Sequence, residues 1–294
     1  MRLHRIVLDE KPCLAVCHAK RLWPVVDLFA MLGYEAPDVV RRADLKSIAA
    51  APAMISSTVE AGLAREDELG QGLDPSHVEH LPPIPDPGKI ICVGLNYKDH
   101  CREQEREIPK TPVIFAKFAN TICAHGDTVK RPTTTEKMDF EGELAVVIGQ
   151  GGKGIHRKDA HKHVFGYTIL NDLTARELQK LDGQWLRAKG QDGFAPMGPG
   201  LVTTDEIPDP QTLTIRTAVN EEVMQNDTTA NMIFPIDMLI EFISAGITLE
   251  PGDIISTGTP SGVGAHRTPP VFLQPGDVVE IDIQKLGTLR TLIG

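Results

Sequence analysis

The sequence lacks long apolar runs, paired cysteines and an excess of positive charge. No stretch approaches the roughly 20 apolar residues that a membrane helix needs, and Met1 to His4 do not open a signal peptide. The five cysteines are odd in number and widely spaced, unlike those of a disulfide scaffold. The formal net charge of -10 argues against nucleic acid, whose phosphates attract basic surfaces. These absences predict a soluble cytoplasmic protein that binds neither membrane nor nucleic acid.

The 294 residues divide at a proline-dense segment, 81–88. Proline cannot continue a helix or pair inside a sheet, so this segment predicts a domain boundary. We expect a small N-terminal unit over residues 1–80 and a larger unit over 81–294. The first unit should hold strands at 3–8 and 13–16 and a helix at 22–32. It contains no cluster of chemically active residues.

The larger unit is predicted to be α+β and mostly β, because short apolar runs separated by Pro-Gly-Asp and similar turns dominate it. The expected strands are 90–93, 113–118, 144–148, 164–170, 213–219, 254–257 and 278–283. Two helices are expected. Thr174 and Glu177 form a capping-box pattern that would open the first, which ends near Gly183. The second covers 236–245.

Three acidic residues flank the predicted strands. Glu141 and Glu143 alternate along an extended segment and would share one face. Carboxylates this close repel unless a proton or cation intervenes, and hard oxygen ligands suit Mg²⁺, Mn²⁺ or Ca²⁺. The pair could equally lie on the solvated face of an edge strand. Asp172, after the strand at 164–170, could be a third metal ligand or could cap the following helix.

Residues suited to binding and proton transfer accompany these acids. Arg176 and Gln179 stand three positions apart and would share one face of the first helix. His100 and Glu103, also three apart, could form the carboxylate-oriented imidazole of a general base, or an ordinary surface pair. Lys189 opens a glycine- and proline-rich segment that reads as a loop.

A second glycine-rich loop, 256–264, follows the strand at 254–257. Its glycines would let backbone amides approach a ligand, and its hydroxyls could bind a carboxylate. The segment lacks the lysine spacing of a phosphate-binding P-loop.

The order and spacing of these residues resemble the fumarylacetoacetate hydrolase family over roughly residues 87–294. The resemblance implies a rolled mixed β-sheet, a homodimer, a small N-terminal α/β accessory domain, and bound Mg²⁺ or Mn²⁺, with Ca²⁺ as a further option. It implies these site residues: metal ligands Glu141, Glu143 and Asp172; catalytic residues His100, Glu103 and Lys189; substrate-binding residues Arg176, Gln179, Gly258 and Thr259. The His100-x-x-Glu103 pair is most similar to the acylpyruvase and oxaloacetate decarboxylase branch.

The expected reaction is therefore hydrolysis of a carbon–carbon bond in a small 2,4-dioxo acid, such as an acylpyruvate or a sugar-derived dioxo acid. The metal would polarise the 2-oxo group, and His100, oriented by Glu103, would activate water. Lys189 would stabilise the oxyanion. Two alternatives stay open: decarboxylation or tautomerisation of oxaloacetate at the same site, and a non-catalytic domain that binds 2-oxo acids.

Overall fold

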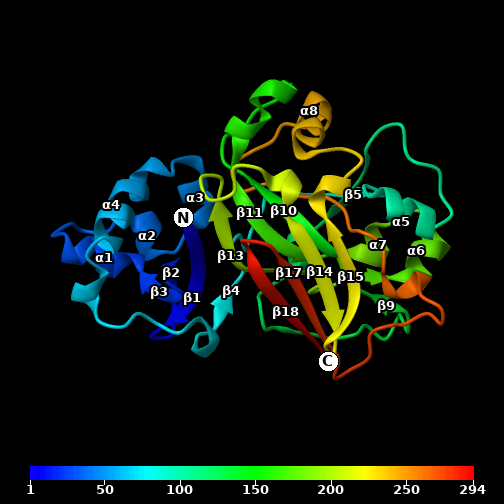
Figure 1. Ribbon diagram of the computed structural model, residues 1–294, viewed down its shortest axis with the longest axis horizontal. Helices are drawn as coiled ribbons and strands as arrows, with labels where there is room; N and C mark the ends of the chain where they lie inside the picture. Colours follow the sequence, from blue (N-terminus) through cyan, green and yellow to red (C-terminus); the bar gives the residue numbers. More distant parts are fainter.

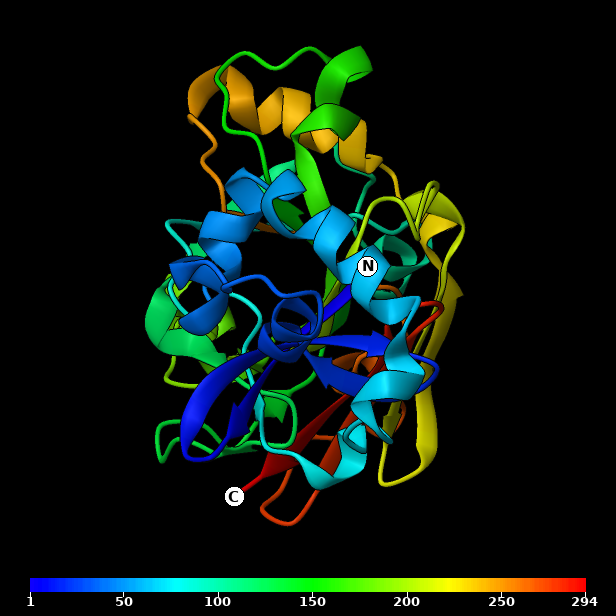
Figure 2. The same cartoon turned by 90° about the vertical axis from the view of Figure 1, so that its left-hand side faces the viewer.

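The computed structural model describes residues Met1 to Gly294, and Figure 1 shows a smaller N-terminal lobe in blue and cyan beside a larger lobe. The smaller lobe begins with a three-stranded meander, β1 (Arg2–Leu8), β2 (Lys11–His18) and β3 (Arg21–Pro24). Its helices are α1 (Val25–Met31), α2 (Asp38–Arg41), α3 (Leu45–Ala50) and α4 (Ala53–Leu63). Figure 2 shows these helices in front of the blue strands.

A long mixed sheet joins the two lobes. Its strand order is β3-β2-β1-β13-β11-β10-β16-β5-β6, with β4 (His80–Leu81) beside β1 and β7 (Ile122–Cys123) beside β13. The remaining strands are β5 (Ile90–Gly94), β6 (Val113–Lys117), β10 (Gly142–Ile148), β11 (Val164–Asn171), β13 (Ala195–Thr203) and β16 (Ile254–Ser256). The β5–β16 pair is parallel and the β10–β11 pair antiparallel.

A second sheet packs on the first. Its order is β15-β14-β17-β18-β8, formed by β8 (Thr128–Val129), β14 (Thr214–Val219), β15 (Glu222–Thr228), β17 (Val278–Ile283) and β18 (Gly287–Ile293). A two-stranded pair is formed by β9 (Met138–Asp139) and β12 (Thr174–Ala175).

Both faces of β10 are buried, which explains its continuous apolar sequence. Leu144 and Val146 point into a 40-residue core that also contains residues of the second sheet, such as Ile281. Ala145 and Val147 belong to a 25-residue core shared with the N-terminal helices. Because successive side chains of β10 point to opposite faces of the sheet, this one strand contributes to both cores.

The helices of the larger lobe are short apart from α8 (Ile236–Gly246), which lies against the 3₁₀ segment η4 (Arg157–His163). The others are α5 (Lys98–Glu103), α6 (Arg176–Asp182) and α7 (Leu186–Lys189). Single 3₁₀ turns complete the chain: η1 (Glu66–Leu69), η2 (Pro75–His77), η3 (Ala119–Thr121), η5 (Pro210–Thr212), η6 (Thr229–Asn231) and η7 (Gly264–His266).

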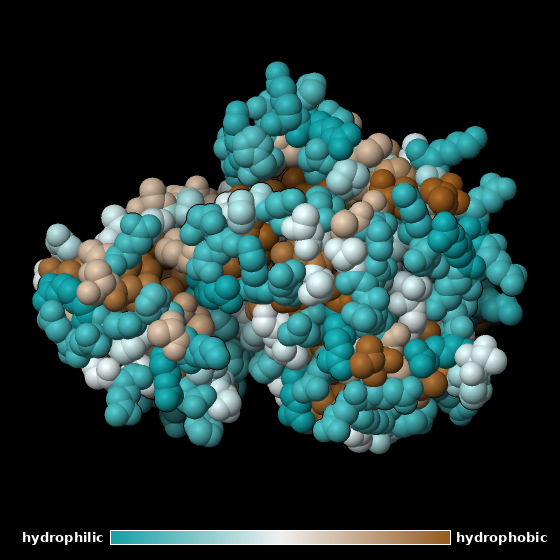
Figure 3. Space-filling view, viewed as in Figure 1, coloured by the Kyte–Doolittle hydropathy of each residue, from teal (hydrophilic) through white to brown (hydrophobic).

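No helix is both long and apolar enough to cross a membrane. The face in Figure 3 is largely hydrophilic, with small hydrophobic patches between the polar groups.

The α+β, mostly-β prediction and the mixed sheet are confirmed, but three local predictions were wrong. The expected helix 22–32 is split, because Arg21–Pro24 pairs with β2 before α1 begins. The expected loop after Lys189 contains β13, a central strand between β1 and β11. The capping box is absent, because the carboxylate of Glu177 accepts from the Glu136 amide and from Thr135 instead.

The division into residues 1–80 and 81–294 remains a prediction. The N-terminal strands continue the main sheet, since β1 pairs with β13 at Leu3 and Leu201. The N-terminal unit is therefore joined to the larger one by backbone hydrogen bonds and a shared core.

Candidate active site and metal centre

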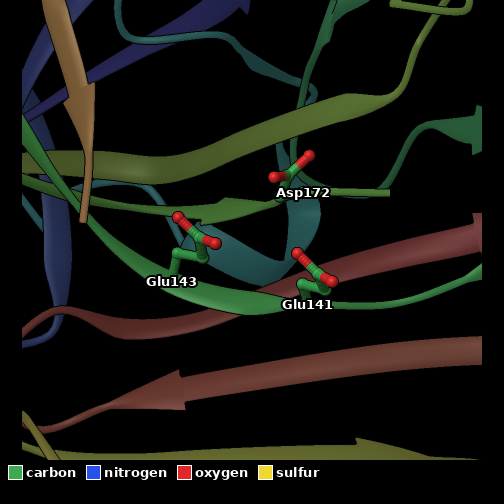
Figure 4. A group of neighbouring side chains, drawn as sticks. All are labelled: Glu141, Glu143 and Asp172. Carbon is green, nitrogen blue, oxygen red and sulfur yellow. The ribbon is translucent and has the colours of Figure 1, made fainter. Parts of the chain in front are cut away.

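Three buried carboxylates converge where β10 meets β11. Gly142 pairs with Asn171, and the Asp172 amide donates to the Glu141 carbonyl at 2.8 Å, so the register brings Glu141 and Asp172 together. Glu143 lies two residues along β10, on the same face as Glu141. Figure 4 shows the three side chains pointing toward one another, and one oxygen of each lies within 4.8 Å of the others. We call Glu141, Glu143 and Asp172 the acidic triad.

The surroundings of Glu143 disfavour an uncompensated negative charge. Burial, together with the negative charges of Asp172 and Glu141, raises its pKa well above the ordinary value. Its Oε2 accepts hydrogen bonds from the Ser256 hydroxyl and, at 2.9 Å, from the Gly258 amide. These donors orient the carboxylate but do not neutralise it.

The negative charge of Glu141 is better compensated by nearby positive charges than that of Glu143. Burial alone would raise its pKa, but the adjacent Lys189 and Arg176 lower it to about 2. Lys189 Nζ donates to Glu141 Oε2 at 2.8 Å, and Arg176 Nη2 lies 2.7 Å from Glu141 Oε1. Arg176 is held from its other side by Asp139, which accepts from its Nε at 2.8 Å.

Asp172 keeps one oxygen without a hydrogen bond. Its Oδ2 accepts from Lys189 Nζ at 2.7 Å. Its Oδ1 lies 2.7 Å from the ammonium of Lys117, but Lys117 directs its protons to three backbone carbonyls, so Oδ1 has no donor. A buried carboxylate oxygen that accepts no hydrogen bond is costly, and a metal ion beside it would satisfy its free lone pairs.

The charge balance fits a divalent cation. The acidic triad and Asp139 supply four buried carboxylates, which face three cations, Lys117, Arg176 and Lys189. One negative charge is left over. A divalent ion would reverse this to one positive charge, which favours an anionic substrate. The donor set is all oxygen, as Mg²⁺, Mn²⁺ and Ca²⁺ prefer.

A histidine–glutamate pair stands nearby on α5. His100 Nδ1 lies 2.9 Å from Glu103 Oε2, and the other oxygen of Glu103 accepts from the Gly262 amide at 2.8 Å. The second contact holds α5 against the glycine-rich loop, and His100 is buried. A carboxylate only accepts hydrogen bonds, so we assign the proton to Nδ1, which leaves Nε2 as the basic atom.

These groups meet in one small cavity with a volume of about 30 Å³. The predicted site residues that line it are His100, Glu141, Glu143, Arg176, Gln179, Lys189 and Thr259. Asp172, Glu103 and Gly258 do not line it. The apolar part of the wall includes Phe115 and Trp185, whose rings meet edge to face at 5.3 Å. Segments far apart in sequence thus build one polar pocket with an aromatic side.

The glycine-rich loop uses its amides differently from the prediction. Those of Gly258, Gly262 and Gly264 donate to Glu143, Glu103 and Asp139 respectively. The Thr259 hydroxyl donates to the Gly142 carbonyl at 2.9 Å and accepts from Gln225 at 2.7 Å. In this structure the loop positions acidic side chains, and substrate binding by Gly258 and Thr259 remains a prediction.

Sequence reasoning did not find Lys117, Gln225 or Gln104 as parts of the site. Lys117 ends an apolar strand, and its closeness to Asp172 depends on long-range pairing. Gln225 lies on an unpredicted strand, β15. Gln104 directly follows the predicted His100-x-x-Glu103 pair, so the helical spacing i,i+4 from His100 could have found it.

Comparison with known proteins identifies relatives of this chain. The family model described as fumarylacetoacetate (FAA) hydrolase C-terminal matches residues 89–293. Oxaloacetate tautomerase YisK of Bacillus subtilis (strain 168) is 50% identical over 233 residues, which cover 78% of this chain and 77% of the relative. The mitochondrial oxaloacetate tautomerase fahd2 of Xenopus laevis is 49% identical over 238 residues, 80% of this chain and 75% of the relative.

Two solved structures share the fold along the whole chain. The fumarylacetoacetate hydrolase of psychrophilic Exiguobacterium antarcticum has a TM-score of 0.81 at 34% identity, covering 100% of this chain and 99% of that one. The maleylpyruvate hydrolase of Sphingobium sp. SYK-6, solved with manganese(II) and pyruvate, has a TM-score of 0.79 at 27% identity and covers 100% of both chains.

Proposed function

This chain belongs to the fumarylacetoacetate hydrolase family, and we propose that it is a metal-dependent tautomerase that interconverts the keto and enol forms of oxaloacetate or a closely similar 2-oxo dicarboxylic acid. One observation carries the proposal: the basic Nε2 of His100 shares a small cavity with Glu141 and Glu143 of the acidic triad, in a chain 50% identical to an oxaloacetate tautomerase. A site for enolate chemistry needs a base beside a cation-binding group.

The acidic triad would hold Mg²⁺ or Mn²⁺, which supplies Lewis acidity that favours the enolate. His100 would take a proton from C3 of the keto acid at Nε2, and Glu103 would stabilise the resulting imidazolium through Nδ1. The proton would then return to the oxygen of the enolate. No water is consumed, and the reaction runs in either direction.

Arg176 and Gln179 support the choice of a dicarboxylic acid. Both line the cavity, and Arg176 Nη1 donates to Gln179 Oε1 at 3.0 Å, which leaves the Gln179 amide nitrogen free for a ligand. We propose that this nitrogen and the guanidinium bind the second carboxylate. The partly enclosed position of the cavity would strengthen these contacts, because charges interact more strongly away from bulk water.

Hydrolysis of a carbon–carbon bond was the first expectation from the sequence, and the relatives favour the tautomerase alternative. Lys189 gives a structural reason. Its three ammonium protons go to Glu141, Asp172 and Thr174, so none is left for an oxyanion in this arrangement. A domain that only binds 2-oxo acids would not need the His100–Glu103 pair.

The homodimer implied by the sequence resemblance also remains a proposal. The end strand β6 and the residue after it expose Val113, Ile114 and Phe118, which a second copy could cover.

The test compares three reactions of the purified wild-type protein with Mg²⁺. Loss of enol absorbance from oxaloacetate reports tautomerisation, release of CO₂ reports decarboxylation, and release of pyruvate from acetylpyruvate reports hydrolysis. We expect tautomerisation to have the highest kcat/KM. If acetylpyruvate hydrolysis is faster and oxaloacetate tautomerises at its spontaneous rate, the proposal is wrong.

A further inference from the structure

Gln104 reaches the catalytic atom of His100. Its Nε2 lies 2.5 Å from Nε2 of the imidazole, and its side chain lines the cavity with Glu141 and Glu143. The residue follows the last turn of α5 and is half-buried. A second side chain therefore stands at the one ring atom that can act as a base.

The contact between Gln104 and His100 agrees with the protonation state assigned to the His100–Glu103 pair. Glu103 fixes the proton of His100 on Nδ1, so Nε2 is an acceptor and Gln104 must present its NH₂ group. When Nε2 becomes protonated, the same carboxamide can turn and accept with its oxygen. The Gln104 amide can thus form a hydrogen bond with His100 both before and after Nε2 takes up a proton.

The end of α5 does not require the Gln104 side chain to contact His100. The backbone amide of Gln104 already donates to the His100 carbonyl at 3.1 Å, and any residue could supply that bond. The side chain makes no other hydrogen bond within the protein, and it is not part of either apolar core. Its contact with the imidazole is therefore the interaction that depends on glutamine.

We propose that Gln104 determines reaction specificity by occupying the position from which His100 would activate water. This inference rests on the proposed tautomerase function. Hydrolysis of an acylpyruvate needs water beside Nε2: the base takes its proton, the oxygen adds to the distal carbonyl, the C–C bond breaks, and the departing enolate is protonated to pyruvate. Tautomerisation needs only the substrate at Nε2.

The free-energy cost of displacing the Gln104 amide from His100 Nε2 is met differently in the two reactions. The substrate brings binding energy from its carboxylates and can replace the amide at Nε2. A water molecule brings no such energy and competes with a tethered amide at high effective concentration.

The test is Gln104→Met, which keeps the chain length but removes the amide. Acetylpyruvate hydrolysis and oxaloacetate tautomerisation are measured on wild type and variant with Mg²⁺. We expect the kcat of hydrolysis to rise about tenfold, the size of effect of one lost hydrogen bond, while tautomerisation changes less. Glu107→Gln, an exposed change on the same segment, should alter neither rate. Gln104→Asn, whose amide falls short of the ring, should behave like Gln104→Met and serves if the methionine variant does not fold.

An unchanged rate of hydrolysis in both Gln104 variants would overturn the inference, as would an equal loss in both reactions. A wild-type protein that does not tautomerise oxaloacetate would overturn the proposed function as well. The two failures are distinguishable, because the second appears without any substitution.

Discussion

The ammonium of Lys189 donates a 2.7 Å hydrogen bond to Oδ2 of Asp172, and both side chains are buried. The negative charges of Asp172 and Glu141 raise the pKa of Lys189 despite its burial, so the ammonium stays charged. In the structure, Lys189 is a fixed counter-charge of the acidic triad. Its predicted role as an oxyanion donor would require it to leave one of these partners.

Replacement of this charge should make stability depend more strongly on metal. In Lys189→Met the buried carboxylates lose a partner, which costs on the order of 3–5 kcal/mol in the metal-free protein. A bound divalent ion would replace much of the lost charge. Thermal unfolding with and without Mg²⁺ should therefore show a larger Mg²⁺-induced rise in Tm for Lys189→Met than for wild type. Lys180→Met, an exposed change on α6, is the control; equal rises in wild type and Lys189→Met would contradict the assignment.

Metal binding itself can be measured without a substrate. Titration calorimetry with Mn²⁺ should give one site per chain, because the triad is the cluster of three or more potential ligands in the structure. Glu143→Gln should weaken binding at least about tenfold, since it removes one charged ligand. Glu136→Gln, on the exposed segment before β9, should leave it unchanged. Equal affinity in wild type and Glu143→Gln would exclude Glu143 as a ligand.

Acid should weaken the junction between the lobes through His4. Burial, followed by the nearby His80, His125 and Arg2, lowers the pKa of His4 to about 3. In the unfolded chain this histidine takes up a proton near pH 6.5, whereas the folded protein does not. Its contribution to stability is therefore complete above pH 6.5 and declines as pH falls toward 3, by up to about 1.4 kcal/mol per pH unit. Below that range the contribution is constant.

Urea unfolding at pH 7 and pH 5 tests this linkage. The free energy of unfolding of wild type should fall more between the two pH values than that of His4→Gln. His18→Gln, which changes a half-exposed histidine on β2, is the control. Parallel losses in wild type and His4→Gln would show that His4 does not resist protonation.

Removal of the N-terminal unit should damage folding rather than chemistry. No residue before Val93 lines the active-site cavity. However, Leu3 and Leu14 share a core with Met197 and Leu201 of β13, so a chain starting at Pro82 would expose an apolar surface and the edge of a central strand. We expect that chain to aggregate. Phe29→Ala in the full chain should lower stability by about 3–5 kcal/mol and leave KM unchanged. A stable, monodisperse truncated protein would contradict this account.

The resemblance to the fumarylacetoacetate hydrolase family predicted the acidic triad, whereas alternation along an extended segment placed only Glu141 and Glu143 on one face. The sequence could not predict how Lys189 is used, since that depends on the distances to Glu141 and Asp172 in the folded chain. β13 was missed because Pro196, Gly198 and Pro199 are typical of loops, yet its neighbours on both sides fix it in the sheet. The split of 22–32 has a similar cause: pairing with β2 overrides the helical preference of Leu22, and Trp23 is of a type that strands favour.

The role of His100 as the base of a keto–enol reaction is tested most directly by one measurement. Decay of enol absorbance from oxaloacetate is followed with wild type and His100→Ala, each shown by calorimetry to bind Mn²⁺ equally. A general base contributes typically about 10²–10⁴-fold, so kcat should fall by that factor in His100→Ala while metal affinity is retained. Arg102→Ala, on the exposed side of α5, should keep wild-type kcat. A His100→Ala protein that binds metal and tautomerises oxaloacetate at the wild-type rate would contradict the account.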